Sequence, residues 1–143
     1  MHPTVKTALA FVNRVTAALY RRSDGRLGGK SVGLPVLLLT VPGRKTGIPR
    51  TAPVIYLEHG DSYVVVGSAF GSKTDPDWMR NLAAADSVRI RIADQEWDVS
   101  ARIATGDERD SLWRNVIAPD LPSLAKHEAR SGRTFPVGVL ARP

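Results

Sequence analysis

The sequence predicts an α+β protein that is mainly β, in which about six antiparallel strands form a small barrel with an N-terminal helix and short peripheral helices. Strand-like runs follow one another through connections too short for a parallel crossover, which indicates antiparallel pairing. Several runs are apolar on both faces, and an antiparallel sheet buries both faces only when it closes or is covered. Helical periodicity at the start and near the end of the chain predicts the helices.

The first predicted element is a cationic amphipathic helix over residues 4–21. Its apolar residues form one stripe, and its basic residues lie elsewhere. The stripe consists of Val5, Leu9, Val12, Val15 and Leu19. We expect it to pack on the domain, and contact with an anionic membrane surface is the alternative. The expected organisation is this helix, within residues 1–22, followed by a single domain over residues 23–143.

Strand-like runs come next at residues 35–41, 51–58 and 62–68, with a turn at 58–61. A short helix is expected over residues 75–86, with Asp75 as its N-cap and Pro76 at its first position. Apolar and polar residues then alternate at 87–94 and 96–104, which predicts a hairpin of two half-exposed strands. The middle of the chain thus predicts a meander, a helix and a hairpin.

The C-terminal part predicts two helices and a closing strand. Thr105 and Glu108 match a capping box that opens a helix over residues 106–118, which Pro119 ends. A second helix over residues 122–132 ends at Gly132. Residues 134–141 have strand character.

Charge is distributed unevenly along the chain. The total is +6, yet residues 1–57 hold nine Lys or Arg and one acid, Asp24, whereas the other 86 residues hold eleven bases and thirteen acids. The first part therefore favours an anionic partner, which is a nucleic acid, a membrane surface or a phosphorylated or carboxylated small molecule. The chain has no cysteine, which excludes thiol catalysis and suits a cytoplasmic protein.

No self-sufficient catalytic or metal-binding motif is present. His2, His59 and His127 lie far apart and lack metal-ligand spacing, and no serine lies in a nucleophile-elbow motif. Residues 25–31 imitate a phosphate-binding P-loop but have too few residues between the glycines. If the protein is an enzyme, we expect a bound cofactor to carry the chemistry.

The stretch GRKTGIPR, residues 43–50, holds three cations between two strand-like runs. Gly43 and Gly47 allow a tight turn, which would present Arg44, Lys45 and Arg50 to one spot. Such a turn suits a phosphate, and a solvated charged hairpin explains the pattern equally well.

Five segments in order resemble the deazaflavin-dependent nitroreductase family of actinobacteria. They are VLLLTVPGRKTGIPRTAPVIYL, YVVVGS, DPDWMRNLAA, VRIRIADQEWDVSAR and RTFPVGVL, within residues 20–141. The most specific feature is the GRKTGIPR element followed about thirty residues later by Trp-x-x-Asn-Leu. The resemblance implies a split β-barrel that uses reduced coenzyme F420.

The resemblance also implies where the cofactor binds. Its phosphate would lie on the turn at Arg44, Lys45 and Arg50, with help from the backbone of Thr46 and Gly47. Its ring would lie against a strand end and the following helix, at Gly67, Ser68, Ala69, Trp78 and Asn81. Core packing is the alternative for Trp78, and an amide on the helix surface is the alternative for Asn81.

The implied reaction is hydride transfer to an activated double bond, a quinone or a similar conjugated acceptor, including α,β-unsaturated lactones and xenobiotics. Ser68 is the candidate hydrogen-bond donor to the acceptor. Relatives that reduce nitroimidazoles carry several tyrosines in the segment that corresponds to residues 119–132, which has none here, so we do not expect that activity. Leu121, Leu124 and His127 lie there, and we expect a pocket that prefers bulky apolar acceptors.

Two other functions stay open, namely an FMN-dependent oxidoreductase on the same barrel and a non-catalytic deazaflavin carrier. Nucleic-acid binding is not expected, because the bases are not interleaved with aromatic residues, which make up only 6% of the chain. We expect a cytoplasmic location, with the inner face of the membrane as an alternative. The sequence gives no indication of the oligomeric state.

Overall fold

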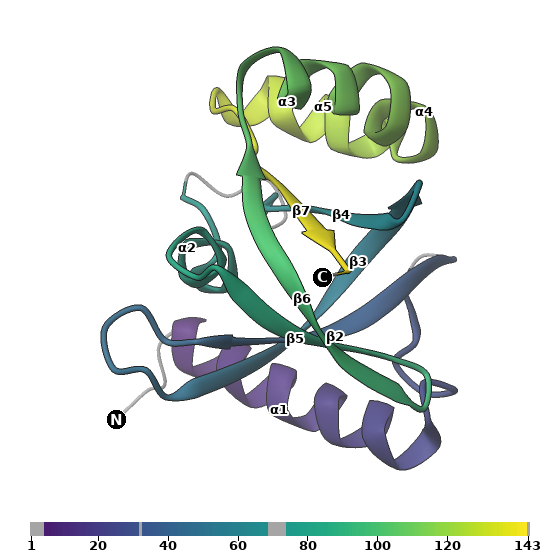
Figure 1. Ribbon diagram of the computed structural model, residues 1–143, viewed down its shortest axis with the longest axis vertical. Helices are drawn as coiled ribbons and strands as arrows, with labels where there is room; N and C mark the ends of the chain where they lie inside the picture. The colour runs from purple at the N-terminus through teal and green to yellow at the C-terminus, as the bar shows by residue number, and fades with distance from the viewer. Residues whose placement is uncertain (1–4, 32, 69–73, 143) are drawn as a thin grey trace.

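The computed structural model describes residues 5–31, 33–68 and 74–142. Within them, six antiparallel strands form a closed barrel, and a seventh, short strand pairs at its side (Figure 1). The strands are β1 (Lys30–Ser31), β2 (Leu34–Pro42), β3 (Pro49–His59), β4 (Ser62–Val66), β5 (Ser87–Ile92), β6 (Gln95–Ala104) and β7 (Val137–Ala141). The expected mainly β barrel of about six strands is confirmed.

The barrel closes in the order β2-β3-β4-β7-β6-β5, because β2 also pairs with β5. Within the barrel, β2 therefore has a partner on each side. Its residue Leu39 lies opposite Ala52 on β3 and opposite Ile90 on β5. The short β1 pairs only with the start of β2. Closure leaves β2 without a free edge. Its central residues are apolar on both faces because one face points into the barrel and the other is covered by α1.

The interior of the barrel is filled by alternate side chains of its strands. Leu37, Leu39 and Val41 of β2 are completely buried there, and Val36 and Leu38 face the other way. Met79 and Leu82 from the short helix α2 (Asp77–Ala83) belong to the same interior cluster. α2 therefore packs against the apolar core and is held in place by it.

The other helices cover the outside of the barrel in two places (Figure 1). α1 (Val5–Ser23) lies along one side, across β2 and β3. A helical cap lies at the opposite end of the view and packs on β3, β4, β6 and β7 through the second core cluster. It comprises α3 (Gly106–Leu112), the π-helical segment η2 (Trp113–Ile117), α4 (Ala118–Asp120) and α5 (Pro122–Ser131).

The face of α1 that packs is not the predicted one. Ala17 and Tyr20 are buried against the barrel, whereas Val12, Val15 and Leu19 of the predicted stripe are 55%, 44% and 45% exposed. A small alanine lets the helix approach the strands closely, and the tyrosine satisfies buried backbone groups. The expectation that the stripe packs on the domain is therefore wrong for these three residues.

Tyr20 connects α1 to two separate parts of the barrel. Its hydroxyl lies 3.0 Å from the carbonyl oxygen of Val36 and 3.3 Å from that of Arg91, and it accepts a hydrogen bond from the Ala93 amide at 3.0 Å. The β5–β6 turn consists of Ala93, which has a φ of 55°, and Asp94, and Gln95 is the first residue of β6. The hydroxyl thus fixes the helix to β2 and to this turn.

The predicted N-cap Asp75 and the predicted capping box of Thr105 and Glu108 are wrong, and in both cases the carboxylate has a charged partner. Asp75 is not an N-cap, since Pro76 precedes the first helical residue and Asp75 binds Arg133. Thr105 is the N-cap of α3, but without a side-chain cap bond, and Glu108 forms a two-pronged ion pair with Arg102 instead of the capping box. A guanidinium is the stronger partner for a carboxylate than a neutral amide.

Pro119 does not end the preceding helix at its own position. The chain stays helical to Asp120, because the wider π-helical turn at Trp113–Ile117 comes just before the proline. A proline lacks the amide hydrogen and clashes with the preceding turn of a regular α-helix, and here that preceding turn is π-helical. The expected helix end at Gly132 is confirmed by its left-handed φ of 72°.

Candidate functional site

The GRKTGIPR element forms the connection between β2 and β3, which project together to one side of the barrel (Figure 1). Pro42 pairs with Pro49 at the base of this β2–β3 turn. The Gly43 amide donates to the Ile48 carbonyl at 2.9 Å, and the Gly47 amide donates to the Gly43 carbonyl at 2.7 Å. The turn is thus closed by its own backbone.

Both glycines of the turn are required by geometry. Gly47 has a φ of 74°, a backbone conformation that residues with a Cβ rarely adopt. A Cβ on Gly43 would lie 2.9 Å from the Thr46 hydroxyl oxygen and 3.2 Å from the Ile48 carbonyl oxygen. Thr46 in turn accepts a hydrogen bond from the Ile48 amide at 3.2 Å. The Gly47 amide and the Thr46 hydroxyl therefore serve the shape of the turn itself.

The turn and the start of β3 offer donors to an anion. Lys45 in the turn and Arg50, the second residue of β3, are exposed, and within the described residues neither forms an ion pair. In the same part of the chain, the amides of Lys45 and Thr46 have no protein acceptor. Two cations beside two free backbone amides make a donor set that suits a phosphate. These are the donors that a cofactor phosphate on the turn, as the resemblance implies, would use.

Arg44 connects the turn to α2 through Asn81. The backbone amide of Arg44 donates to Asn81 Oδ1 at 3.0 Å, and its Nη1 atom donates to the same oxygen at 2.8 Å. Its Nη2 atom lies 3.8 Å from Asp77 Oδ1, one helical turn earlier. Asn81 is only 6% exposed, so the alternative of an amide on the helix surface is wrong. The motif spacing quoted above therefore reflects a direct contact.

The end of β4 lies next to α2. Gly67 is buried, and a Cβ there would lie 2.9 Å from Pro136 and 3.0 Å from Met79, so packing alone requires glycine. Its amide donates to the Pro136 carbonyl at 2.9 Å. Ser68 is half-buried at the strand end. Ala69 lies outside the described residues.

Trp78 is half-buried at the start of α2 and packs against the interior cluster. This packing supports the alternative that Trp78 is a core residue. Because the side chain is only half-buried, part of the indole is still accessible to a ligand. Leu121 is buried in the outer core and Leu124 packs against it, so both serve the helical cap. They therefore anchor the cap to the barrel.

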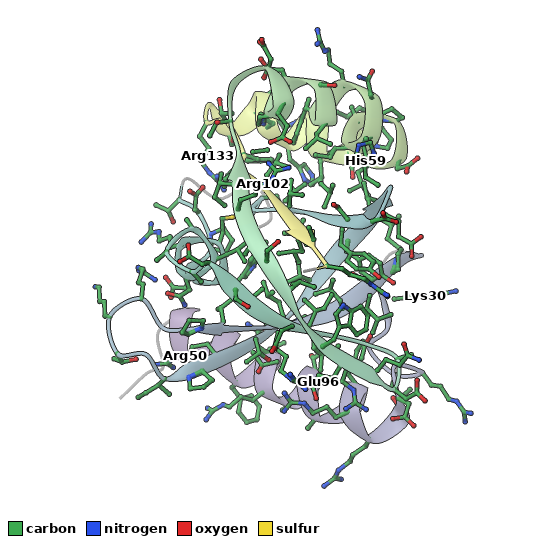
Figure 2. The ribbon with its side chains drawn as sticks, in the orientation of Figure 1. Lys30, Arg50, His59, Glu96, Arg102 and Arg133 are labelled. Carbon is green, nitrogen blue, oxygen red and sulfur yellow. The ribbon has the colours of Figure 1, made fainter. Side chains whose placement is uncertain are left out.

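Arg133 is a member of this region that the sequence did not indicate. It binds Asp75, just before α2, at 2.6 Å, and its Nη2 atom donates to the carbonyls of Gly67 at 3.2 Å and Ser68 at 2.9 Å. The partners in these contacts are separated by 58 to 66 residues in the sequence, so a local sequence pattern could not predict them. Figure 2 shows Arg133 on the side of the molecule where α2 lies.

The basic residues of the first part do not form one patch. Figure 2 shows Arg50 and Lys30 on opposite sides of the barrel. The described residues contain no cluster of ligands for a metal ion. A hollow of about 250 Å³ lies at the base of the turn, lined by Thr40, Val41, Pro42, Pro49, Ser87, Val88, Arg89 and Asp98. It is smaller than pockets that enclose a whole ligand, which exceed about 300 Å³.

Residues 12–142 match the family model described as F420H(2)-dependent quinone reductase. The chain belongs to this family. A curated member, an F420H(2)-dependent quinone reductase of Mycobacterium tuberculosis H37Rv, is 34% identical over 132 residues, which cover 90% of this chain and 89% of the relative. A second, a putative F420H(2)-dependent quinone reductase of the same strain, is 38% identical over 64% of this chain and 78% of the relative.

Solved structures agree with the family. An F420-H2-dependent reductase named FDR-A has a TM-score of 0.66 and 29% identity, over 74% of this chain and 93% of that one. A chain described as a domain-swapped dimer has a TM-score of 0.67 and 26% identity, over 91% and 96%. The family confirms the expected split β-barrel fold, the reductase class and coenzyme F420 as cofactor. No helix in the described part of the chain is long and apolar enough to cross a membrane.

Proposed function

We propose that this member of the quinone reductase family transfers a hydride from reduced coenzyme F420 to a quinone-type acceptor, and that the β2–β3 turn holds the cofactor's phosphate. The observation that carries the proposal is the donor set of the turn, which consists of exposed cations and free amides. Three cations close together repel one another, and a bound phosphodiester would reduce this repulsion.

The phosphate would bind the Lys45 and Thr46 amides and the side chains of Lys45 and Arg50. Arg44 would approach from the α2 side, where Asn81 already holds it. The Gly47 amide is used within the turn, so Gly47 contributes its left-handed conformation. A turn shaped before the ligand arrives loses little entropy on binding.

The ring would lie against the end of β4, at Gly67 and Ser68, and against Trp78 on α2. When bound, the reduced deazaflavin supplies a hydride. A quinone takes up this hydride and one proton from solvent to become the quinol, so electrons and atoms balance. The chain's own task is to orient the acceptor, exclude water and stabilise the negative oxygen that develops on it.

Ser68 is the proposed donor to that oxygen. It is half-buried and lies at the strand end beside the proposed ring position. Ser68→Ala should slow hydride transfer in a single turnover while the affinity for F420 stays the same. An unchanged transfer rate in this variant withdraws the role of the hydroxyl.

The direct test of the activity is an anaerobic stopped-flow experiment. Purified protein is mixed with reduced F420 and a water-soluble naphthoquinone, and the return of the oxidised F420 absorbance is followed. We expect rapid, saturable oxidation that depends on the protein. Tight F420 binding without reduction of any quinone, enone or nitroimidazole would indicate the carrier alternative, and co-purified FMN would indicate the flavin enzyme.

We also propose that α1 brings the enzyme to an anionic membrane surface. Phe11, Val12, Val15 and Leu19 are 44–61% exposed on the outer side of the helix, and Arg14 and Arg22 are exposed beside them. An exposed apolar stripe with flanking cations suits the boundary of an anionic bilayer. Apolar quinones partition into bilayers, so this surface would bring the enzyme to its acceptor.

Vesicle sedimentation tests the membrane proposal. Wild type should sediment with anionic phosphatidylglycerol vesicles and much less with zwitterionic phosphatidylcholine vesicles. Val12→Ser combined with Val15→Ser should reduce binding while leaving hydride transfer to a water-soluble quinone unchanged. Equal sedimentation with and without the two valines would contradict the proposal.

A further inference from the structure

Arg133 is held in place through its backbone and through its side chain, in addition to its contacts with the end of β4. Its amide donates to the Ser131 hydroxyl at 3.2 Å, and that hydroxyl donates to the Glu128 carbonyl of α5 at 2.9 Å. Its guanidinium lies over the Phe135 ring, 4.7 Å from the ring centre. The side chain is 16% exposed. The guanidinium is therefore a rigid attachment between the helical cap and the strand end.

The contacts of this guanidinium determine which way the strand-end amide points. In a trans peptide unit the C=O and the N–H of the next residue point in opposite directions, and the described residues contain no cis peptide. Because the Gly67 carbonyl faces Arg133, the Ser68 amide hydrogen faces away from it. Within the described residues, the Ser68 amide has no protein acceptor. A free donor therefore stands at the proposed ring position.

We propose that Arg133 is a positioning residue for the redox reaction. It holds the end of β4 against the start of α2, so that the Ser68 amide can donate to the carbonyl-bearing edge of the deazaflavin ring. This inference rests on the proposed function. Arg133 touches neither cofactor nor acceptor in this account and acts only through the backbone that it holds. Asp75 keeps the guanidinium in place from the α2 side.

The test compares Arg133→Ala and Arg133→Lys with Arg102→Ala. Arg102 forms an exposed ion pair with Glu108 and serves as a matched loss of one arginine (Figure 2). Lysine keeps the charge of Arg133 but not the planar fork that reaches two carbonyls and a carboxylate. The readouts are amide hydrogen exchange of Gly67 without cofactor, the Ser68 amide NMR shift on adding oxidised F420, and the single-turnover hydride transfer rate.

We expect faster Gly67 exchange and no F420-induced Ser68 shift in both Arg133 variants, whereas Arg102→Ala matches wild type. The hydride transfer rate at saturating cofactor should fall about tenfold or more, the range for one lost charge-assisted contact. Added guanidinium ion should restore part of the rate of Arg133→Ala, and sodium at equal ionic strength should not. Cofactor affinity should change little, because the β2–β3 turn is intact.

Four results would overturn the inference, and the first three leave the proposed function intact. One is a Ser68 shift in Arg133→Ala equal to that of wild type, and another is a transfer rate no lower than that of Arg102→Ala. The third is a wild type in which F420 shifts the turn amides but not the Ser68 amide, which overturns this inference alone. A wild type with no F420-induced shift at any amide overturns the proposed function as well.

Discussion

At the scale of single residues, the cations of the candidate site differ in their contacts, and we expect them to differ in their roles. Lys45 and Arg50 face outward without ion pairs in the described part of the chain, and they are available to a ligand. Arg44 is held inward by Asn81 and lies near Asp77. The three bases that look equivalent in the sequence therefore have two different environments, and substitutions at them should have different consequences.

Arg50→Ala should weaken F420 binding by about 1.5 to 3 kcal/mol, the range for a hydrogen bond to a charged group. Titration of cofactor fluorescence measures the dissociation constant. Arg114→Ala removes an equally exposed cation from the helical cap and is the control. A dissociation constant unchanged in Arg50→Ala would contradict the assignment of the phosphate to the turn. Added salt should weaken the wild type, because exposed charges are screened.

Asn81→Leu should weaken F420 binding by a similar amount, because the amide and the guanidinium of Arg44 lose their shared acceptor. Asn81→Asp keeps an acceptor oxygen but adds a negative charge that competes with the phosphate for Arg44, so it should also bind more weakly. Asn115→Leu changes an exposed asparagine on the helical cap and is the matched control. If both Asn81 variants bind like the control, the link from α2 to the turn has no role in binding.

At the scale of elements, α1 packs on the barrel through Ala17 and Tyr20, whereas Phe11, Val12, Val15 and Leu19 are exposed. Burial raises the pKa of the Tyr20 hydroxyl, and the hydrogen bond from Ala93 and the charge of Arg91 lower it by less. The neutral hydroxyl is thus favoured in the folded protein. Beside this hydroxyl, Arg91 donates a hydrogen bond to the Arg21 carbonyl at 3.4 Å, so the end of α1 is attached to β5 as well.

Tyr20→Phe should lower the free energy of unfolding by about 1 to 3 kcal/mol, because the Ala93 amide and the Val36 carbonyl lose their partner. Urea denaturation followed by circular dichroism measures the change. Tyr63→Phe, at a half-buried tyrosine in the barrel interior, is the control. A loss in Tyr20→Phe no larger than in the control would show that the hydroxyl does not stabilise the attachment of α1.

The raised pKa of Tyr20 also predicts a dependence on pH. The unfolded chain deprotonates this group near its ordinary value of about 10, and the folded protein does so only at higher pH. Its contribution to stability is therefore complete below pH 10 and is lost as the pH rises through the folded value. Wild type should lose stability above pH 10 more steeply than Tyr20→Phe, and parallel curves would contradict this.

At the scale of the whole molecule, alternating and doubly apolar strands were sufficient to predict the barrel. Short connections account for the β2–β3, β3–β4 and β5–β6 pairings, and the turn at residues 43–48 was visible as glycines around cations, whereas the β4–β7, β6–β7 and β2–β5 pairings join distant strands. Contacts between distant segments were not predictable in the same way. The orientation of α1, the bond from Asn81 to Arg44 and the clamp of Arg133 depend on tertiary packing, and an amphipathic pattern does not say which face a tyrosine and an alanine will bury.

The central claim concerns where the cofactor's negative group binds, and a crystal structure of the complex with oxidised F420 tests it most directly. We predict phosphate oxygens within hydrogen-bond distance of the Lys45 and Thr46 amides and of the Arg50 guanidinium, with the ring beside Ser68 and Trp78. Cofactor bound at another surface, with Lys45 and Arg50 still facing solvent, would contradict the account.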